Sequence, residues 1–186
     1  MALAKKILKW GAIVLVGGFV LLVIVRVFHF GNLEKTNEQV EKIHSTRLQL
    51  SDVMGENLPP DPGEAADDTI AGVDANENGI RDDVELAVFE KYPKSAKKRA
   101  VSLQYAMALQ MMTTQEIFNT DTATAVIQQK SRAYECVGDN SEVRNFVDEK
   151  QLNTKERKEW DEEFYGKVGS YSELRENICD LDLSTL

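Results

Sequence analysis

The segment from Asp74 to Glu85 carries oxygen-bearing residues at a spacing suited to binding a hard cation. Calcium takes six to eight oxygen ligands at about 2.3 to 2.6 Å, so the chain must wrap tightly to supply them. Gly79 permits the sharp turn that this wrapping needs. The expected ligands are Asp74, Asn76 and Asn78 through side-chain oxygens, Ile80 through its carbonyl, Asp82 directly or through water, and Glu85 through both carboxylate oxygens.

These residues resemble an EF-hand calcium loop, whose signature is D-x-[DN]-x-[DN]-G-x5-E. The likeness covers one stretch of twelve residues, and no second loop of this pattern occurs in the chain. Arg81 stands where paired EF-hands usually have an aliphatic residue, and residues 67–73 are too short and glycine-broken for a full entering helix. The segment is therefore more similar to the loop-then-helix sites of dockerins and thrombospondin type-3 repeats, which are extracellular structural modules. The run from Asn78 to Glu85 also resembles small membrane-anchored bacterial envelope proteins, which implies no activity.

An alternative interpretation needs no metal, because Asp and Asn before Gly favour turns and helix caps by themselves. A simple cap does not require Asp74, Asn76 and Glu85 together, so the spacing favours calcium. Three carboxylates against one divalent ion indicate modest affinity, of about 0.1 to 1 mM, as in extracellular modules. We therefore expect a structural role for the ion and not a signalling role.

Residues 10–30 form an apolar stretch, interrupted by Arg26 and His29, that follows three lysines. Twenty-one helical residues span about 31 Å, enough to cross the hydrocarbon core of a bilayer. The lysines keep the amino terminus in the cytoplasm, which places the bulk of the chain in the periplasm or exterior. A cleavable signal peptide is the alternative, but residues 25–30 offer no small-x-small cleavage site. We expect an uncleaved anchor in the inner or cytoplasmic membrane.

The net charge of −9 is distributed unevenly along the chain. The first thirty residues hold four basic side chains and no acidic ones, which leaves 18 basic and 31 acidic groups beyond them. The exposed part thus carries a net charge of −13. Such a surface repels nucleic acid and anionic lipid and attracts divalent cations.

Cys136 and Cys179 are the only cysteines, and both lie outside the membrane in the expected topology. In an oxidising compartment an even count favours one disulfide. It would close a loop of 43 residues, which is worth about 4 kcal/mol if the effect is entropic. Two buried free thiols are the alternative, and a metal site is disfavoured because no histidine follows His44.

The chain divides by composition beyond the anchor. Residues from Leu33 to Met54 follow alternating steps of three and four, the seam of a short coiled coil, which Thr36 and Arg47 spoil in part. Self-association, packing on the globular part and a stalk that continues the membrane helix are all compatible with this pattern. We expect four parts: a cytoplasmic start and transmembrane signal anchor (1–30), a membrane-proximal helix or short coiled coil (31–56), a Pro-rich acidic linker (57–68) and an extracytoplasmic calcium-binding helical domain (69–186).

The last part shows helical periodicity and no alternating strand pattern, so the predicted fold class is all α. We expect a compact bundle of about five helices opened by the loop, with residues 95–115 at its centre because this segment has little polar face. The tail from Asp180 is expected to fray. Helices are expected, in order, at residues 82–92, 95–115 and 121–137, after Ser141, after Asn153 and after Ser172.

These patterns favour a membrane-anchored, extracytoplasmic calcium-binding protein with a structural or interaction role in the cell envelope. Nucleophile elbows, histidine pairs, phosphate loops and zinc spacings are absent from the sequence, so we expect no enzyme. The expected partners are the membrane, through residues 10–30, and a protein or second copy, through residues 33–54, with no nucleic acid. The alternative is an envelope hydrolase that cleaves cell-wall glycan with paired carboxylates, for which the available residues are Glu149, Asp161, Glu162 and Glu163.

Overall fold

The structure, a computed structural model, describes the backbone of residues 2–174 and 177–186. The side chains of residues 2–5, 7, 8, 12 and 29 lie outside the described part of the structure. They include Lys5, which precedes the expected membrane span, and His29 near its end. Every regular element in the described part is helical and no strand occurs there, which confirms the all-α class. The elements are α1 (Ala2–Ser45), α2 (Leu50–Met54), the 3-10 helix η1 (Gly63–Asp67), α3 (Asp82–Lys91), α4 (Ala96–Thr114), α5 (Thr120–Val137), α6 (Ser141–Gln151), α7 (Lys155–Phe164) and the 3-10 helix η2 (Tyr165–Lys167).

The first of two compact units, Met1–Glu38, is formed by α1. This helix is long and apolar enough to cross a membrane: an 18-residue window within it has a mean hydropathy of 2.6, and none of that window is buried. The Arg26 guanidinium lies 5.3 Å from the centre of the Phe30 ring, so it is directed toward the carboxyl end of the apolar stretch. Length and composition thus confirm a candidate membrane span or signal anchor near the amino terminus.

The second unit, Gln39–Leu186, begins inside α1. Ile43 is fully buried there, and the Gln129 side chain donates a 2.9 Å hydrogen bond to its carbonyl oxygen. A ring nitrogen of His44 lies 3.0 Å from Oε1 of Gln128, also in α5. The sequence left three alternatives for this segment: self-association, packing on the globular part, and a stalk. The last turns of α1 pack on the globular part.

The membrane-proximal segment was expected to form one helix as far as Met54, but this helix ends at Ser45. The chain leaves the helix for four residues, and the Asp180 carboxylate accepts a 2.9 Å hydrogen bond from the backbone N–H of Leu48. This external partner replaces the carbonyl that a continuing helix would offer. As a result Leu48 is buried, whereas Leu50 and Met54 are about half exposed. The prediction of a single helix over this segment is wrong.

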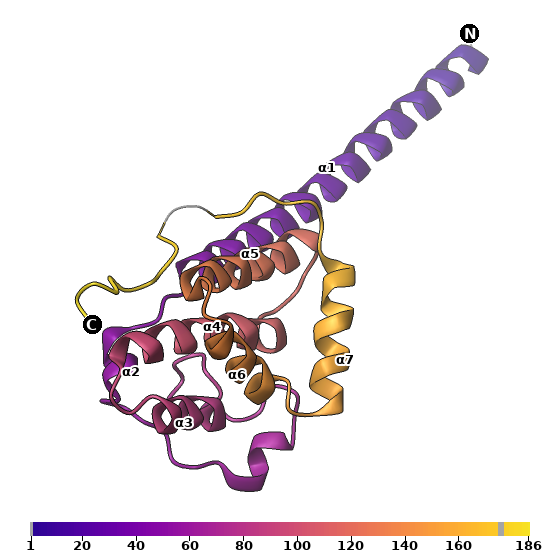
Figure 1. Ribbon diagram of the computed structural model, residues 1–186. Coiled ribbons are helices and arrows are strands. Elements are labelled where there is room, and N and C mark those ends of the chain that lie inside the picture. Colours follow the sequence, from indigo (N-terminus) through magenta and orange to yellow (C-terminus); the bar gives the residue numbers. More distant parts are fainter. Residues whose placement is uncertain (1, 175–176) are drawn as a thin grey trace. The chain divides into compact units, whose positions relative to one another are not determined.

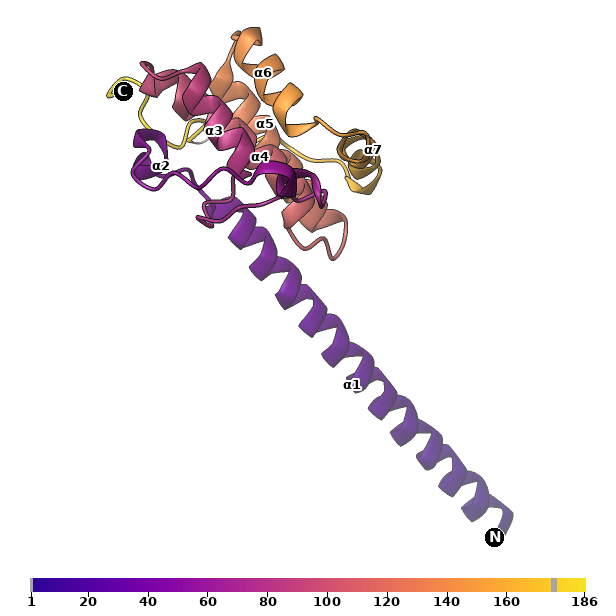
Figure 2. The same cartoon turned by 90° about the horizontal axis from the view of Figure 1, so that it is seen from below.

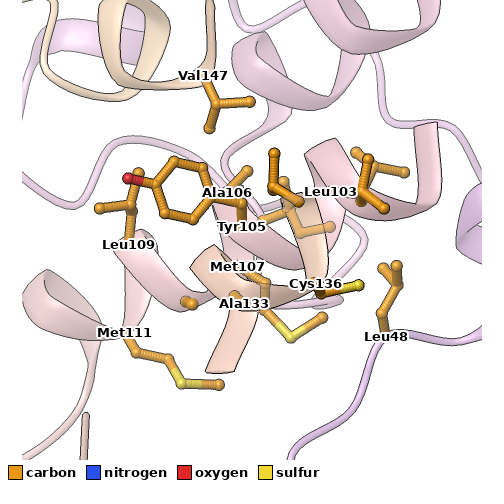
Figure 3. Packing of buried hydrophobic residues seen from close by; sticks show 14 of the residues in the cluster. Leu48, Leu103, Tyr105, Ala106, Met107, Leu109, Met111, Ala133, Cys136 and Val147 are labelled. Atoms are coloured by element: carbon orange, nitrogen blue, oxygen red, sulfur yellow. The ribbon is translucent and has the colours of Figure 1, made fainter. Parts of the chain in front are cut away.

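The central helix is α4, as its lack of a polar face predicts. Every residue from Arg99 to Met112 is buried. Around it pack α3, α5 and α6, and α2 and α7 lie on opposite sides of it in both views (Figure 1 and Figure 2). Figure 3 shows side chains from α4, α5 and α6 that meet Leu48 in one hydrophobic cluster. Burial of these apolar side chains is the main stabilising term of the unit.

The expected linker at residues 57–68 is not free chain, because a buried arginine binds its end. Arg157 in α7 is 2% exposed and donates hydrogen bonds to the carbonyls of Ala66 (2.6 Å), Thr69 (2.9 Å) and Ile70 (3.0 Å). A guanidinium has five N–H donors, so one side chain can satisfy several carbonyls of irregular backbone. The segment that contains η1 is thereby packed against the helical unit.

The helix expected after Ser172 is not found in the described residues 168–174 and 177–186, and residues 175–176 of that prediction lie outside the described part of the chain. The Gln104 side chain instead pairs with this segment, donating to the Ile178 carbonyl (2.8 Å) and accepting from the Asp180 backbone N–H (2.9 Å). Arg132 adds a 2.6 Å ion pair with the Asp180 carboxylate. These partners take the backbone groups that a helix would use internally.

The sulfur atoms of Cys136 and Cys179 lie 2.06 Å apart, at disulfide distance, which confirms the expected pairing. The link joins the end of α5 to the segment that Gln104 binds. The Asp180 side chain, next in sequence, is only 1% exposed. The prediction that the tail frays from Asp180 is therefore wrong at its first residue.

Candidate metal centre

The first half of the loop folds around the Asp74 carboxylate. Its two oxygens accept hydrogen bonds from the backbone N–H groups of Asn78 (3.1 Å) and Gly79 (2.9 Å). Gly79 has a φ of 82° and Glu77 a φ of 56°, so the backbone is left-handed at both residues. Asn78 Oδ1 accepts from the Ile80 N–H (2.9 Å). The turn-forming side chains of Asp and Asn thus build this part of the loop.

The second half of the site is the Glu85 carboxylate, which the start of α3 positions inside the loop. Its Oε2 accepts hydrogen bonds from the side-chain nitrogens of Asn76 (3.1 Å) and Asn78 (3.0 Å). The Asn76 nitrogen also donates to the carbonyl of Asn57 (2.9 Å), which ties the expected linker to the loop. Glu85 is 1% exposed, and Asn76 Oδ1 is a buried oxygen without a hydrogen-bond partner among the described residues.

The Asp82 carboxylate is bound by the loop backbone and not by the side chains of the two asparagines. Both of its carboxylate oxygens accept from the backbone N–H of Ala75, at 3.0 and 3.2 Å, and its own backbone N–H donates to the Val73 carbonyl (2.9 Å). Asp82 therefore closes the base of the loop at the first residue of α3. Ile80, the expected carbonyl donor, has a fully buried side chain in the hydrophobic core, which anchors the loop.

The three acidic side chains among the expected ligands, those of Asp74, Asp82 and Glu85, lie in an unfavourable electrostatic environment. Burial raises the pKa of Asp74 and of Asp82, and raises that of Glu85 to about 7. Hydrogen bonds from loop N–H groups partly offset this effect, and neighbouring carboxylates add to it. Within the described residues none of the three forms an ion pair with a lysine, arginine or histidine.

Four of the six expected ligands are thus linked by hydrogen bonds, namely Asp74, Asn76, Asn78 and Glu85. Asp82 closes the base of the loop through Ala75, and the Ile80 side chain lies in the hydrophobic core. In the part of the chain that the structure describes, no three His, Cys, Asp or Glu side chains converge as a metal-binding group. The arrangement offers two carboxylates and two amides, a mixed oxygen set of the kind that calcium accepts.

Arg81 is a residue of this region whose role was not expected from the sequence. It is fully buried and its guanidinium pairs with Asp83, with Nε 2.5 Å from Oδ1. It also donates to the carbonyls of Lys150 (2.7 Å) and Gln151 (3.2 Å) and to Asn153 Oδ1 (3.2 Å). Arg81 thus joins the loop to the end of α6. The available signal was its position, where the EF-hand pattern expects an aliphatic side chain.

Comparison of the chain with known proteins identified no relative. No family model, no curated protein and no solved structure matches the chain. What the loop binds has therefore to be inferred from its own residues.

The four carboxylates available to the alternative hydrolase are not brought to one place. Asp161 in α7 lies in a cleft and accepts a 3.0 Å hydrogen bond from Lys130. Glu149 borders a different hollow, and Glu162 and Glu163 are exposed on α7. Only Asp161 among the four enters that cleft.

Proposed function

We propose that this chain is a membrane-anchored protein that binds calcium outside the cytoplasm and has a structural or interaction role in the cell envelope. The apolar part of α1 would be the anchor, and the loop that begins at Asp74 would hold the ion. The role proposed for the ion is to stabilise the fold, not to take part in catalysis.

The observation that carries the proposal is the pair of asparagine side chains around the Glu85 carboxylate. A buried carboxylate normally has a cationic side chain or a metal beside it, because burying an uncompensated charge is costly. Among the described residues, the side chains that donate hydrogen bonds to the Glu85 carboxylate are the amides of Asn76 and Asn78, and the pKa of Glu85 is raised to about 7, chiefly by burial. Calcium, when bound, would supply the positive charge that this site lacks.

The remaining donors suit the same ion by their chemistry. Asn76 Oδ1 is the buried oxygen without a partner. Because the nitrogens of both asparagines face Glu85, coordination through the amide oxygens requires each amide to rotate. Asp82 already accepts from Ala75 with both oxygens, so we assign it a role through water. The proposed ligands are Asp74, Asn76, Asn78 and Glu85 through side chains, Ile80 through its carbonyl and Asp82 through water.

A structural role follows from what the loop touches. Asn76 reaches Asn57, Arg81 reaches the end of α6, and Glu85 belongs to α3. Fixing the loop therefore fixes an irregular segment and two helices at once. A ligand that binds only the folded protein stabilises it by mass action.

The decisive experiment is a calcium titration of the full-length protein in non-ionic detergent, followed by calorimetry and thermal unfolding. At an affinity of 0.1 to 1 mM, roughly 10 mM calcium should add about 1.4 to 2.7 kcal/mol to the free energy of unfolding. Asp74→Ala and Glu85→Gln should abolish both the heat of binding and the rise in melting temperature.

The matched control is Glu77→Gln, which removes one charge from an exposed position of the loop that is not a proposed ligand. This variant should retain the response to calcium, with an affinity within about threefold of the wild type because exposed charges interact weakly. A wild-type melting temperature that does not change in millimolar calcium would reject the site.

The proposed topology has its own test. A protease that reaches only the cytoplasmic side of the membrane should leave residues 39–186 intact, because the lysines before the span favour a cytoplasmic amino terminus. Digestion of that unit from the cytoplasmic side would overturn the orientation and leave the calcium site unaffected.

A further inference from the structure

A cleft with a volume of about 600 Å³ lies among α4, α5, α6, α7 and the chain that follows η2. That volume is typical of small-ligand sites. Four of its lining residues are tyrosines from four different elements: Tyr105 in α4, Tyr134 in α5, Tyr165 in η2 and Tyr171 in the C-terminal segment. None of the residues that line the cleft is a proposed calcium ligand.

The cleft already binds one alkylammonium group, that of Lys130. Its Nζ lies 3.0 Å from Asp161 Oδ1 and 5.1 Å from the centre of the Tyr165 ring. Burial alone lowers the pKa of Lys130, but Tyr165 and Asp161 outweigh it and the pKa is raised. A carboxylate together with a tyrosine face therefore holds a partly buried ammonium group, with a side chain 16% exposed, in its charged form here.

The cleft contains a second set of carboxylates and a second tyrosine ring that bind no ammonium group of the described chain. Glu135 and Glu173 line the cleft, and neither forms an ion pair among the described residues. The Tyr171 hydroxyl lies 3.3 Å from Ser131 Oγ. Within the described chain no cation lies over the Tyr171 ring, whereas Arg144 lies 4.5 Å from the centre of the Tyr134 ring.

The charge of the lining selects against anions. Among the described residues that line it, the acidic ones are Glu135, Asp148, Asp161 and Glu173, and Lys130 is the only basic one. Asp148 accepts a 2.9 Å hydrogen bond from the buried Tyr105 hydroxyl, and Asp161 is paired with Lys130. The two glutamates thus remain to attract positive charge, and aromatic faces favour cations over neutral groups of the same shape.

We propose that this cleft binds a small soluble organic cation, whose alkylammonium group lies between the Tyr171 ring and the carboxylates of Glu135 and Glu173. This site is independent of the calcium loop. The ligand would be bound by carboxylates and a tyrosine ring, the same kinds of group that hold Lys130.

The test uses choline and its uncharged carbon isostere dimethylbutanol with the full-length protein in non-ionic detergent, with calcium present. Choline should bind at one site per chain, and the isostere should bind at least about tenfold more weakly, because only the charge differs. Equal binding of the two ligands, or no binding of choline, would overturn the proposal.

Two pairs of variants locate the site. Tyr171→Phe keeps the aromatic face and should bind choline as the wild type does, whereas Tyr171→Leu should weaken binding about tenfold. Glu135→Gln combined with Glu173→Gln should weaken it at least as much, and Glu163→Gln, on the exposed face of α7, should have no effect. Choline binding that is insensitive to both cleft variants would place the ligand elsewhere and refute the assignment.

Discussion

The side-chain nitrogen of Asn78 lies 3.0 Å from Glu85 Oε2, which joins the turn of the loop directly to the first turn of α3. An amide donor favours the ionised carboxylate, yet burial opposes ionisation more strongly. The loop therefore contains an acidic group that titrates near neutral pH in the metal-free protein.

The stability of the calcium-free protein should depend on pH through this group. The pKa of Glu85 is about 7 in the folded chain against an ordinary value of 4.5, so the folded state binds more protons than the unfolded state between these values. Stability then decreases as pH rises from about 4.5 to about 7. With a chelator present, Glu85→Gln should show a smaller decrease in the free energy of unfolding over this range, measured by urea denaturation.

The control for this prediction is Glu90→Gln, which changes an exposed carboxylate on the same helix. Its pH dependence should follow that of the wild type. Parallel curves for Glu85→Gln and the wild type would show that Glu85 ionises as an ordinary carboxylate.

Much of the helical framework could be predicted from local pattern, because α3, α4 and α5 each begin and end within one residue of the expected ranges. Their periodicity and flanking caps are local properties of the sequence. The helices expected after Ser141 and after Asn153 each begin one residue away from the expected start, because Asn140 caps α6 and Thr154 caps α7.

The segments that were predicted wrongly are those whose backbone is bound by distant side chains. A helix was expected after Ser172, but Gln104 and the link from Cys136 to Cys179 bind the chain at Ile178 and Cys179, where it is not helical. Arg81 could not be predicted to cross to α6, because its acceptors come from a helix end distant in sequence. Such long-range hydrogen bonds leave no periodic signal.

Gly72 is a position where a single methyl group should be costly. Its φ is 69°, and a Cβ there would lie 2.4 Å from Arg81 Cδ and 3.0 Å from the Ala66 carbonyl oxygen. Gly72→Ala should therefore lower the free energy of unfolding by about 2 to 4 kcal/mol, from backbone strain and from displacement of Arg81. Gly63→Ala is the matched control: its φ is 55°, with no atom within 4 Å of the added Cβ. It should lose only about 1 to 2 kcal/mol, and equal losses would contradict the steric part of the argument.

Arg157→Lys should release the irregular chain that the arginine binds. A lysine has three donors on one nitrogen and cannot reproduce the hydrogen bonds of the guanidinium to Ala66, Thr69 and Ile70. We expect a loss of about 2 to 4 kcal/mol and faster amide hydrogen exchange at residues 63–72. Lys155→Gln, which disrupts an exposed ion pair in the same helix, should change stability by less than about 0.5 kcal/mol. Unchanged exchange in Arg157→Lys would indicate that other contacts hold this segment.

The pairing of Cys136 with Cys179 can be separated from the hydrogen bonds beside it. Replacing both cysteines by alanine removes a link across 43 residues and should cost about 4 kcal/mol, because the unfolded chain gains freedom. Asp180 keeps Arg132 and Gln104 as partners in this variant, so amide exchange at residues 177–181 should become faster without reaching the rate of free chain.

Reduction of the wild-type protein should produce the same loss of stability. Arg132→Met with the cysteines intact should also raise exchange at residues 177–181, in this case because the ion pair with Asp180 is removed. Two alkylatable thiols in the untreated protein would refute the link, and the hydrogen bonds of Gln104 and Arg132 would then hold the segment alone.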